Sequence, residues 1–211
     1  MQSIKLSAVV NKIMDLVFLT IYWLVCCIPV FTIGAATTAL YYTMQKVIKN
    51  DRGYAAGEYW SAFKSNFKVS TLCWLIHLAL GFLFADECYI CYQMWADGDP
   101  VGWLWLLFAL LEAINVMMAL FTFPYIARFD DRVGRTMKNS LFIMLLNLPK
   151  AVLQLLLIAM FVYCIYRFVP VILVAPAAYM LLSTYLLEKT FRKYMSKEDL
   201  AAEQERNAAV Q

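Results

Sequence analysis

Two ionisable side chains occur in apolar surroundings where they can do chemistry. His77 is the single histidine of the chain, and Glu112 interrupts a long apolar run. Polar groups inside a bilayer are expensive and are often functional. An imidazole and a carboxylate at one depth can relay a proton or contact a polar substrate, and Asn115, one helical turn from Glu112, would extend the pair. The alternative, which we favour because nothing nearby repeats the motif, is a structural contact between two helices.

The composition predicts that these residues lie in a membrane. The hydrophobic fraction is 63% and the charged fraction 16%, whereas ordinary soluble domains are about 45–50% apolar. Four predominantly apolar runs approach the ~20 residues of a membrane crossing, at 69–90, 101–123, 151–166 and 168–187. His77 and Glu112 then lie on adjacent antiparallel helices, each about 16 Å from the outer boundary, and we expect them to touch.

The first uncharged run, Leu16 to Gln45, is too long for one simple crossing. It would span about 45 Å as a single helix, against a hydrocarbon core of about 30 Å. Pro29 and Gly34 lie in its middle, and Thr32 can cap a new helix near Ala35. We therefore expect two short helices joined by a bend, as a broken or re-entrant hairpin, with a single crossing as the alternative.

A break of this kind can offer backbone groups to a cavity or a partner. The predicted broken-helix motif comprises Pro29, Thr32, Gly34, Thr37 and Thr38. The predicted fold is all-α: a polytopic membrane helix bundle with five to six membrane-embedded helices, plus cytoplasmic amphipathic helices. We expect a single integral membrane domain over 1–197 and a solvated tail over 198–211.

The basic residues predict the orientation of the helices, because Lys and Arg near membrane ends are retained on the cytoplasmic side. They gather in 46–68, in 128–150 and near the C-terminus, whereas the segment 86–100 holds none. We therefore expect a multi-pass protein of the bacterial inner, or plasma, membrane with a cytoplasmic C-terminus. If the first run forms the expected hairpin, the N-terminus lies in the cytoplasm too, and Arg167 is the one external base.

Two cytoplasmic segments are expected to form amphipathic helices on the membrane surface. In 58–68, aromatic residues recur at helical spacing with lysines between them, and 135–142 is a weaker counterpart. Asn66 and Asn147 are expected to cap the membrane helices that follow them. The predicted cytoplasmic interface comprises Trp60, Phe63, Lys64, Asn66, Phe67, Lys68, Asn147, Pro149 and Lys150.

The remaining chemistry-bearing residues point to no reaction. Cys88 and Cys91 form a CxxC near the outer boundary, where they can pair or bind a metal, but without a second CxxC or a local His a structural role is the better interpretation. No Walker, GxGxxG or GxSxG motif occurs. The basic clusters flank membrane helices, so anionic headgroups explain them better than nucleic acid. We therefore expect no enzyme, no catalytic residues, no metal and no cofactor.

The stretch Trp23-Leu24-Val25-Cys26-Cys27-Ile28-Pro29-Val30-Phe31-Thr32-Ile33-Gly34-Ala35-Ala36-Thr37-Thr38-Ala39-Leu40-Tyr41-Tyr42 resembles the YesL family of bacterial integral membrane proteins. The segments Phe63-Lys64-Ser65-Asn66-Phe67-Lys68 and Asn147-Leu148-Pro149-Lys150 are similar to that family as well. The resemblance implies a domain of unknown function whose genes often accompany carbohydrate ABC importers. No catalytic residue carries over from it.

These observations lead to two expected functions. The first is an accessory or permease-like component associated with carbohydrate uptake, with the lipid bilayer and ABC importer subunits as partners. The second is a non-transporting membrane scaffold or sensor that binds protein or lipid at its cytoplasmic face. The sequence leaves the oligomeric state open.

Overall fold

The computed structural model describes residues 2–50 and 53–195, without the side chains of 2–11 and 13, and the described residues contain helices and no strand. The predicted all-α class is confirmed for this part of the chain. The elements follow in the order α1 (Gln2–Cys27), η1 (Val30–Thr32), α2 (Ile33–Thr43), η2 (Met44–Lys49), α3 (Ala55–Ala96), η3 (Gly102–Leu104), α4 (Trp105–Ile126), α5 (Val133–Leu146), α6 (Leu148–Arg167), η4 (Val169–Leu173) and α7 (Ala175–Phe191).

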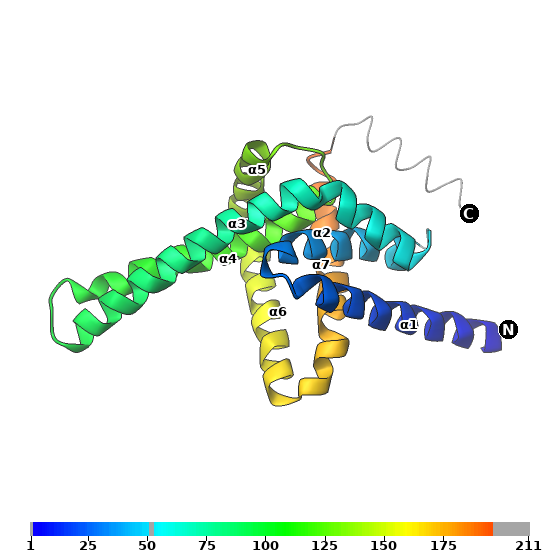
Figure 1. Cartoon of the computed structure of the whole chain (residues 1–211), viewed down its shortest axis with the longest axis horizontal. Helices are drawn as coiled ribbons and strands as arrows, with labels where there is room; N and C mark the ends of the chain where they lie inside the picture. Colours follow the sequence, from blue (N-terminus) through cyan, green and yellow to red (C-terminus); the bar gives the residue numbers. More distant parts are fainter. Residues whose placement is uncertain (1, 51–52, 196–211) are drawn as a thin grey trace.

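Two helical hairpins form the body of the molecule (Figure 1). Helices α3 and α4 run antiparallel along a long arm, and α6 and α7 form a shorter arm whose tip points in another direction. Helix α2 lies where the arms meet, while α1 extends away from them (Figure 1). The largest buried cluster sits at this junction and includes Leu40, Tyr41, Met44, Phe121 and Leu187.

Three of the described helices are long and apolar enough to cross a membrane: Ala55–Ala96, Gly102–Ile126 and Leu148–Arg167. They indicate a membrane protein. The expected fourth span, 168–187, is not one continuous helix. The chain first turns through the 3₁₀ segment η4, with Pro170 near its start, and α7 begins only at Ala175 and has 17 residues. A prediction from apolarity alone misses this turn, because the turn is as apolar as the helix after it.

The predicted bend in the first apolar run is confirmed, but only the second of the two helices is short, since α1 has 26 residues and α2 has 11. Helix α1 ends at Cys27, Pro29 precedes the short η1, and α2 begins at Ile33. Thr32 occupies the N-cap position of α2 but makes no side-chain cap. Its hydroxyl donates instead to the carbonyl oxygens of Cys26 and Pro29. The position of the cap was predicted correctly, but the hydroxyl of Thr32 bonds to carbonyls that precede it and so stabilises the bend.

The segment 58–68 is not a separate surface helix. It forms the first part of α3, which has 42 residues and is therefore about 63 Å long, roughly twice the hydrocarbon thickness. Part of its aromatic face packs on α1, where the ring of Tyr22 lies 6.3 Å from that of Trp60. The weaker counterpart, 135–142, lies within α5 as predicted.

The two asparagine caps are not confirmed. Asn66 lies inside α3, where its amide donates to the carbonyl of Ala62 at 3.0 Å. Asn147 does precede α6, but its amide donates backward to the carbonyl of Ile143 at 2.9 Å. Both side chains hydrogen-bond to a carbonyl of the preceding turn. Asn side chains commonly form such local bonds to the backbone, and these bonds compete with capping. The predicted tail, 198–211, lies outside the described residues.

A close contact between α2 and α3 holds the junction together. A Cβ on Gly34 would lie 2.5 Å from the carbonyl oxygen of Ser70 and 2.7 Å from Cβ of Trp74. Only a residue without a side chain fits there. One turn further along, the hydroxyls of Thr38 and Ser70 are hydrogen-bonded at 2.9 Å. This part of the broken-helix motif therefore serves helix packing.

Candidate functional site

His77 lies between α3 and α4 with both ring nitrogens occupied. Nδ1 is 2.9 Å from Oδ1 of Asn115, and Nε2 is 3.2 Å from the hydroxyl oxygen of Thr122. The amide of Asn115 donates in return to the carbonyl of His77 at 3.2 Å. His77 is 3% exposed and Asn115 7%. Because Oδ1 is only an acceptor, Nδ1 of the imidazole carries a proton.

Glu112 joins this cluster through Asn115. The amide of Asn115 donates to Oε2 of Glu112 at 3.3 Å. The two residues are three positions apart and share one face of α4. The three side chains therefore lie together, but His77 and Glu112 are joined by the amide of Asn115 and not by a direct hydrogen bond. A side-chain amide does not accept and pass on a proton at neutral pH, so the geometry favours a polar contact over a proton relay.

The cluster extends to α5 through residues that the sequence analysis missed. The hydroxyl of Thr122 is 3.0 Å from that of Ser140, and Ser140 also donates to the carbonyl of Met137 at 3.2 Å. Both hydroxyl residues are fully buried. Thr122 lies seven positions after Asn115, on the same helix face, so helical periodicity could have found it. Ser140 had no such signal, because only the packing of α5 on α4 brings it there.

An apolar cleft opens beside this polar cluster. It has a volume of about 620 Å³, and its walls come mainly from the two hairpins, with contributions from α1 and α2. His77, Asn115 and Glu112 are among its lining residues. Phe82 on one arm and Val162 on the other also line it and are 70% and 60% exposed. Those exposed side chains mark the mouth of the cleft.

The broken-helix motif contributes to the cleft wall. The carbonyl of Val30 accepts the backbone N–H of Ile33 and also a hydrogen bond from the indole of Trp74 at 2.7 Å. The hydroxyl of Thr37 accepts one from the indole of Trp23 at 3.2 Å. Trp23, Thr37 and Trp74 all line the cleft. The carbonyl of Val30 is therefore occupied within the fold, and the expectation that the break offers backbone groups to a cavity stays a prediction for the rest of the motif.

The residues of the predicted cytoplasmic interface lie on different helices. Lys64 and Lys68 are exposed on α3, and Trp60 is 40% exposed beside them. Phe63 packs between Trp60 and Phe67, with ring centroids 5.7 Å and 5.5 Å away. The other predicted residues, Asn147, Pro149 and Lys150, lie at the start of α6. Pro149 is exposed, and the ammonium of Lys150 donates to the hydroxyl of Thr190 on α7.

A half-exposed ion pair ties the π-helical segment η2 to the start of α3. The ammonium of Lys46 is 2.8 Å from a carboxylate oxygen of Glu58 and 3.3 Å from the hydroxyl of Tyr42. Burial acts to lower the pKa of Lys46, but these hydrogen bonds outweigh burial and raise the pKa above its ordinary value.

A buried ion pair joins the end of α4 to α7, and it too was missed. Arg128 lies 2.7 Å from Glu188, with the two side chains 11% and 4% exposed. Arg192, one turn further along α7, lies 3.5 Å from the same carboxylate oxygen. Glu188 follows an apolar run, where sequence alone gives no sign that the carboxylate turns inward.

The two cysteines of the CxxC motif are free thiols. Cys91 is 7% exposed, and the thiol of Cys88 lies 3.5 Å from the carbonyl of Trp105. Within residues 2–50 and 53–195, no three His, Cys, Asp or Glu side chains gather in an arrangement that could hold a metal ion.

Comparison with known proteins gives one similarity. Residues 16–86 match the family described as "Protein of unknown function, DUF624". The match covers about a third of the chain and includes the bend, Gly34 and His77, but not Glu112 or Asn115. Neither a curated protein nor a solved structure matches the chain. Together with the three apolar helices, the comparison indicates a membrane protein similar in part to a family of unknown function.

Proposed function

We propose that this protein is an accessory or permease-like membrane component that binds a largely apolar molecule in the cleft between its two hairpins. The cleft itself carries the proposal: about 620 Å³ of space with predominantly apolar walls and a few convergent polar groups. Sites of ~300–1,000 Å³ with this mixture of walls are typical of small-molecule binding. The apolar walls select for a molecule that dissolves in the bilayer.

The walls of the cleft suit an alkyl chain, because they are predominantly apolar and come from both hairpins. The cleft volume of about 620 Å³ lies within the range typical of small-molecule sites. The occupant we propose is therefore of lipid size.

We propose carbohydrate uptake as the setting of this component. The support is the resemblance of residues 23–42 to a family whose genes often accompany carbohydrate importers. The cleft walls give a sugar few hydrogen-bonding partners, and a hydroxyl buried without a partner costs several kcal/mol. The role we assign is thus accessory, with importer subunits as partners, and not that of the sugar carrier.

Photolabelling tests the cleft. The protein in nanodiscs is irradiated with a neutral long-chain alcohol that carries a diazirine, and the labelled peptides are mapped by mass spectrometry. We expect label on the wall that the α3–α4 hairpin contributes, at Leu78–Ala85 and Val116–Phe123. Ala85→Trp should block it, because Ala85 lines the cleft. The matched control is Leu83→Trp, on the same helix and 54% exposed but outside the cleft. Equal labelling in both variants would contradict a cleft-bound ligand.

A pull-down tests the setting. Tagged protein is recovered in mild detergent from its native host during growth on a complex carbohydrate, and partners are identified by mass spectrometry. Recovery of importer permease or ATPase subunits is the expected result. A solitary protein would remove the carbohydrate setting and leave the cleft unaffected.

The exposed aromatic and basic surface of α3 supports a second candidate function, a scaffold or sensor that binds anionic lipid. Trp60 is 40% exposed, and Lys64 and Lys68 are exposed on the following turns, the pattern of a membrane-surface helix. Reversing both lysines to Glu should then abolish the binding of anionic lipid. Apolar replacements of His77 and Glu112 should leave that binding intact. The opposite result would favour the cleft.

A further inference from the structure

Among His77, Asn115 and Glu112, the carboxyl group of Glu112 has hydrogen-bonding capacity left over. Both ring nitrogens of His77 are occupied, and Asn115 uses its carbonyl oxygen and its amide within the cluster. Among the described residues, Asn115 is the side chain that hydrogen-bonds to Glu112, through Oε2. The second oxygen, Oε1, is therefore available to a ligand, and a carboxylate has room for about four hydrogen bonds in all.

Gly81 keeps that oxygen accessible. A Cβ at position 81 would lie 3.4 Å from Oε1 of Glu112 and 3.5 Å from the amide nitrogen of Asn115. Since glycine has no side chain, nothing from α3 covers the carboxyl group at this point. Gly81 and Glu112 both line the cleft, so the exposed oxygen and the apolar space belong to the same cavity.

The cleft wall around this oxygen is apolar on both hairpins. Leu78 and Phe82 come from α3, Val116 and Leu120 from α4, and Phe161 and Ile165 from α6. A carboxylate among such side chains gains most from a ligand group that both donates hydrogen bonds and carries positive charge, because charge-assisted hydrogen bonds are about twice as strong as neutral ones. An amide or an alcohol offers only the weaker kind.

We propose that the cleft binds a cationic amphiphile, whose primary amine donates to Oε1 of Glu112 while its alkyl chain lies between the hairpins. This inference rests on the proposed function, because it adds a head group to the ligand that the cleft is already proposed to hold. His77 and Asn115 act as positioning residues that fix the carboxyl group through the hydrogen bonds described above.

A series of probes with one chain and three head groups tests the proposal. The full chain is placed in nanodiscs of phosphatidylcholine, which carries no net charge, and dissociation constants are measured for twelve-carbon chains that end in a primary amine, a hydroxyl or a carboxylate. Each probe competes with the diazirine alcohol for labelling of the cleft. We expect the dissociation constant of the amine to be about tenfold or more below that of the alcohol, which is the gain typical of a hydrogen bond to a charged group. The carboxylate should bind most weakly.

Three variants assign that preference to one side chain. Glu112→Gln keeps an acceptor for Asn115 but removes the charge, so the affinity for the amine should fall to about that for the alcohol, and the preference for the amine should disappear. Glu112→Asp keeps the charge and retracts it by one methylene, so it should retain a reduced preference. The matched control is Asp86→Asn, which removes a carboxylate from the same hairpin outside the cleft and should change nothing.

The outcomes separate the two proposals. Equal binding of amine and alcohol to the unchanged protein, or an amine preference that survives in Glu112→Gln, would overturn the cationic ligand and leave an apolar cleft ligand standing. Failure of every probe to displace the cleft label, or loss of the preference in Asp86→Asn but not in Glu112→Gln, would overturn both the ligand class and its site.

Discussion

Two buried polar clusters connect the helices of this protein, and they differ in whether their partners are all internal. In the ion pair of α4 and α7, Glu188 faces Arg128 at 2.7 Å and Arg192 at 3.5 Å, so a carboxylate is met by two guanidinium groups of the same chain. In the cleft cluster, Glu112 is met by one amide and keeps an oxygen toward open space.

The difference separates a structural role from a binding role. A buried charge whose counter-charges belong to the same chain is neutralised within the fold, and its removal acts on stability. A polar group that folding leaves incompletely partnered beside an open cleft can be completed by a ligand. The α6–α7 hairpin supplies a third, neutral case: Gln154 accepts from Tyr179 at 3.0 Å and from Ser183 at 2.9 Å, away from Glu112.

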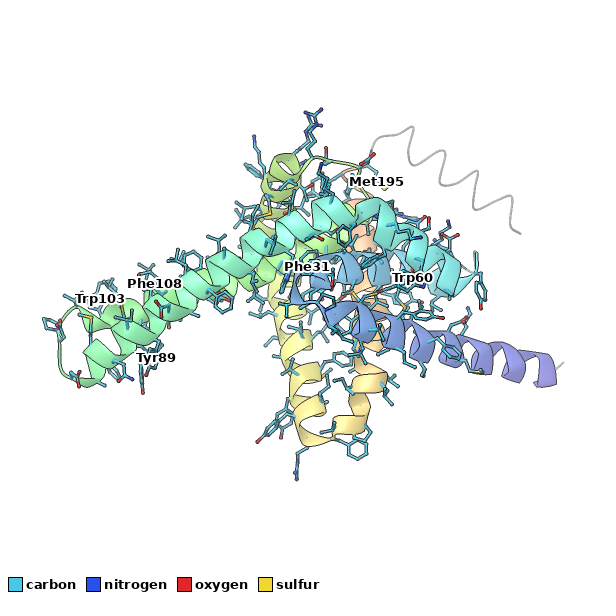
Figure 2. All side chains as sticks on the ribbon, in the orientation of Figure 1. Phe31, Trp60, Tyr89, Trp103, Phe108 and Met195 are labelled. Atoms are coloured by element: carbon cyan, nitrogen blue, oxygen red, sulfur yellow. The ribbon has the colours of Figure 1, made fainter. Side chains whose placement is uncertain are left out.

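The outer end of the α3–α4 hairpin differs again, because large aromatic rings project from it. Figure 2 shows Tyr89, Trp103 and Phe108 projecting from this arm, and Tyr89 and Trp103 are 63% and 58% exposed. Amphipathic rings of this kind anchor helices at a membrane boundary. The hairpin thus combines an anchoring tip with a polar cluster nearer the junction.

The largest effect is expected for Glu188→Ala, which leaves Arg128 buried without this counter-charge. The free energy of unfolding, measured by denaturant titration in detergent micelles, should fall by about 3–5 kcal/mol, whereas amine affinity in any folded fraction should not change. The control is Glu58→Ala, which removes a half-exposed ion pair with Lys46 and should cost about 1 kcal/mol or less. Similar losses of unfolding free energy in both variants would show that the buried ion pair contributes no more to stability than the half-exposed one.

Gly34→Ala tests whether the close contact of α2 and α3 supports the cleft wall. The new Cβ would lie 2.5 Å from a backbone oxygen and 2.9 Å from the ring of Phe123, so the helices must separate, at about 3 kcal/mol of unfolding free energy. Gly134→Ala is the control, since its Cβ would meet nothing within 4 Å. That variant should be unchanged or stabilised by up to about 1 kcal/mol.

Asn115→Ala, compared with Gln154→Ala, tests the cleft cluster against the neutral cluster of the α6–α7 hairpin. It removes the partner of Nδ1 of His77 and the donor to Glu112, so we expect a loss of about 2 kcal/mol in unfolding free energy together with a loss of the amine preference. Gln154→Ala should destabilise by a similar amount, because two hydroxyls lose their acceptor, but the amine preference should survive. If both variants lose it, the carboxyl group is not positioned by Asn115.

The sequence analysis succeeded where one local signal was sufficient and failed where packing decided. Pro29 marks the bend because proline restricts the backbone whatever surrounds it. His77, Asn115 and Glu112 were found because polar residues are conspicuous in apolar runs. The π-helical turn at 44–49, by contrast, has no signal of its own, because its residues are ordinary helix formers.

The hairpin tips and caps show the same limit. The 3₁₀ turn at 169–173 is as apolar as a membrane helix, so only its geometry reveals that α7 starts late. The asparagines at 66 and 147 have a cap's residue type, but each bonds to the preceding turn. Residue type therefore predicted which groups are polar, and tertiary structure decided which partner each one took.

The smallest expected effect concerns the reach of the cleft cluster toward α5. Thr122→Val keeps the shape of the side chain but removes a hydroxyl that lies 3.2 Å from Nε2 of His77 and 3.0 Å from the hydroxyl of Ser140, so about 1 kcal/mol of unfolding free energy should be lost. Ser140→Ala should cost about as much. If the two hydroxyls act as one chain, the double variant loses less than the sum of the single losses, with a coupling of at least about 0.5 kcal/mol. Additive losses would mean that the cluster ends at Thr122, and that α5 is joined to the cleft by packing alone.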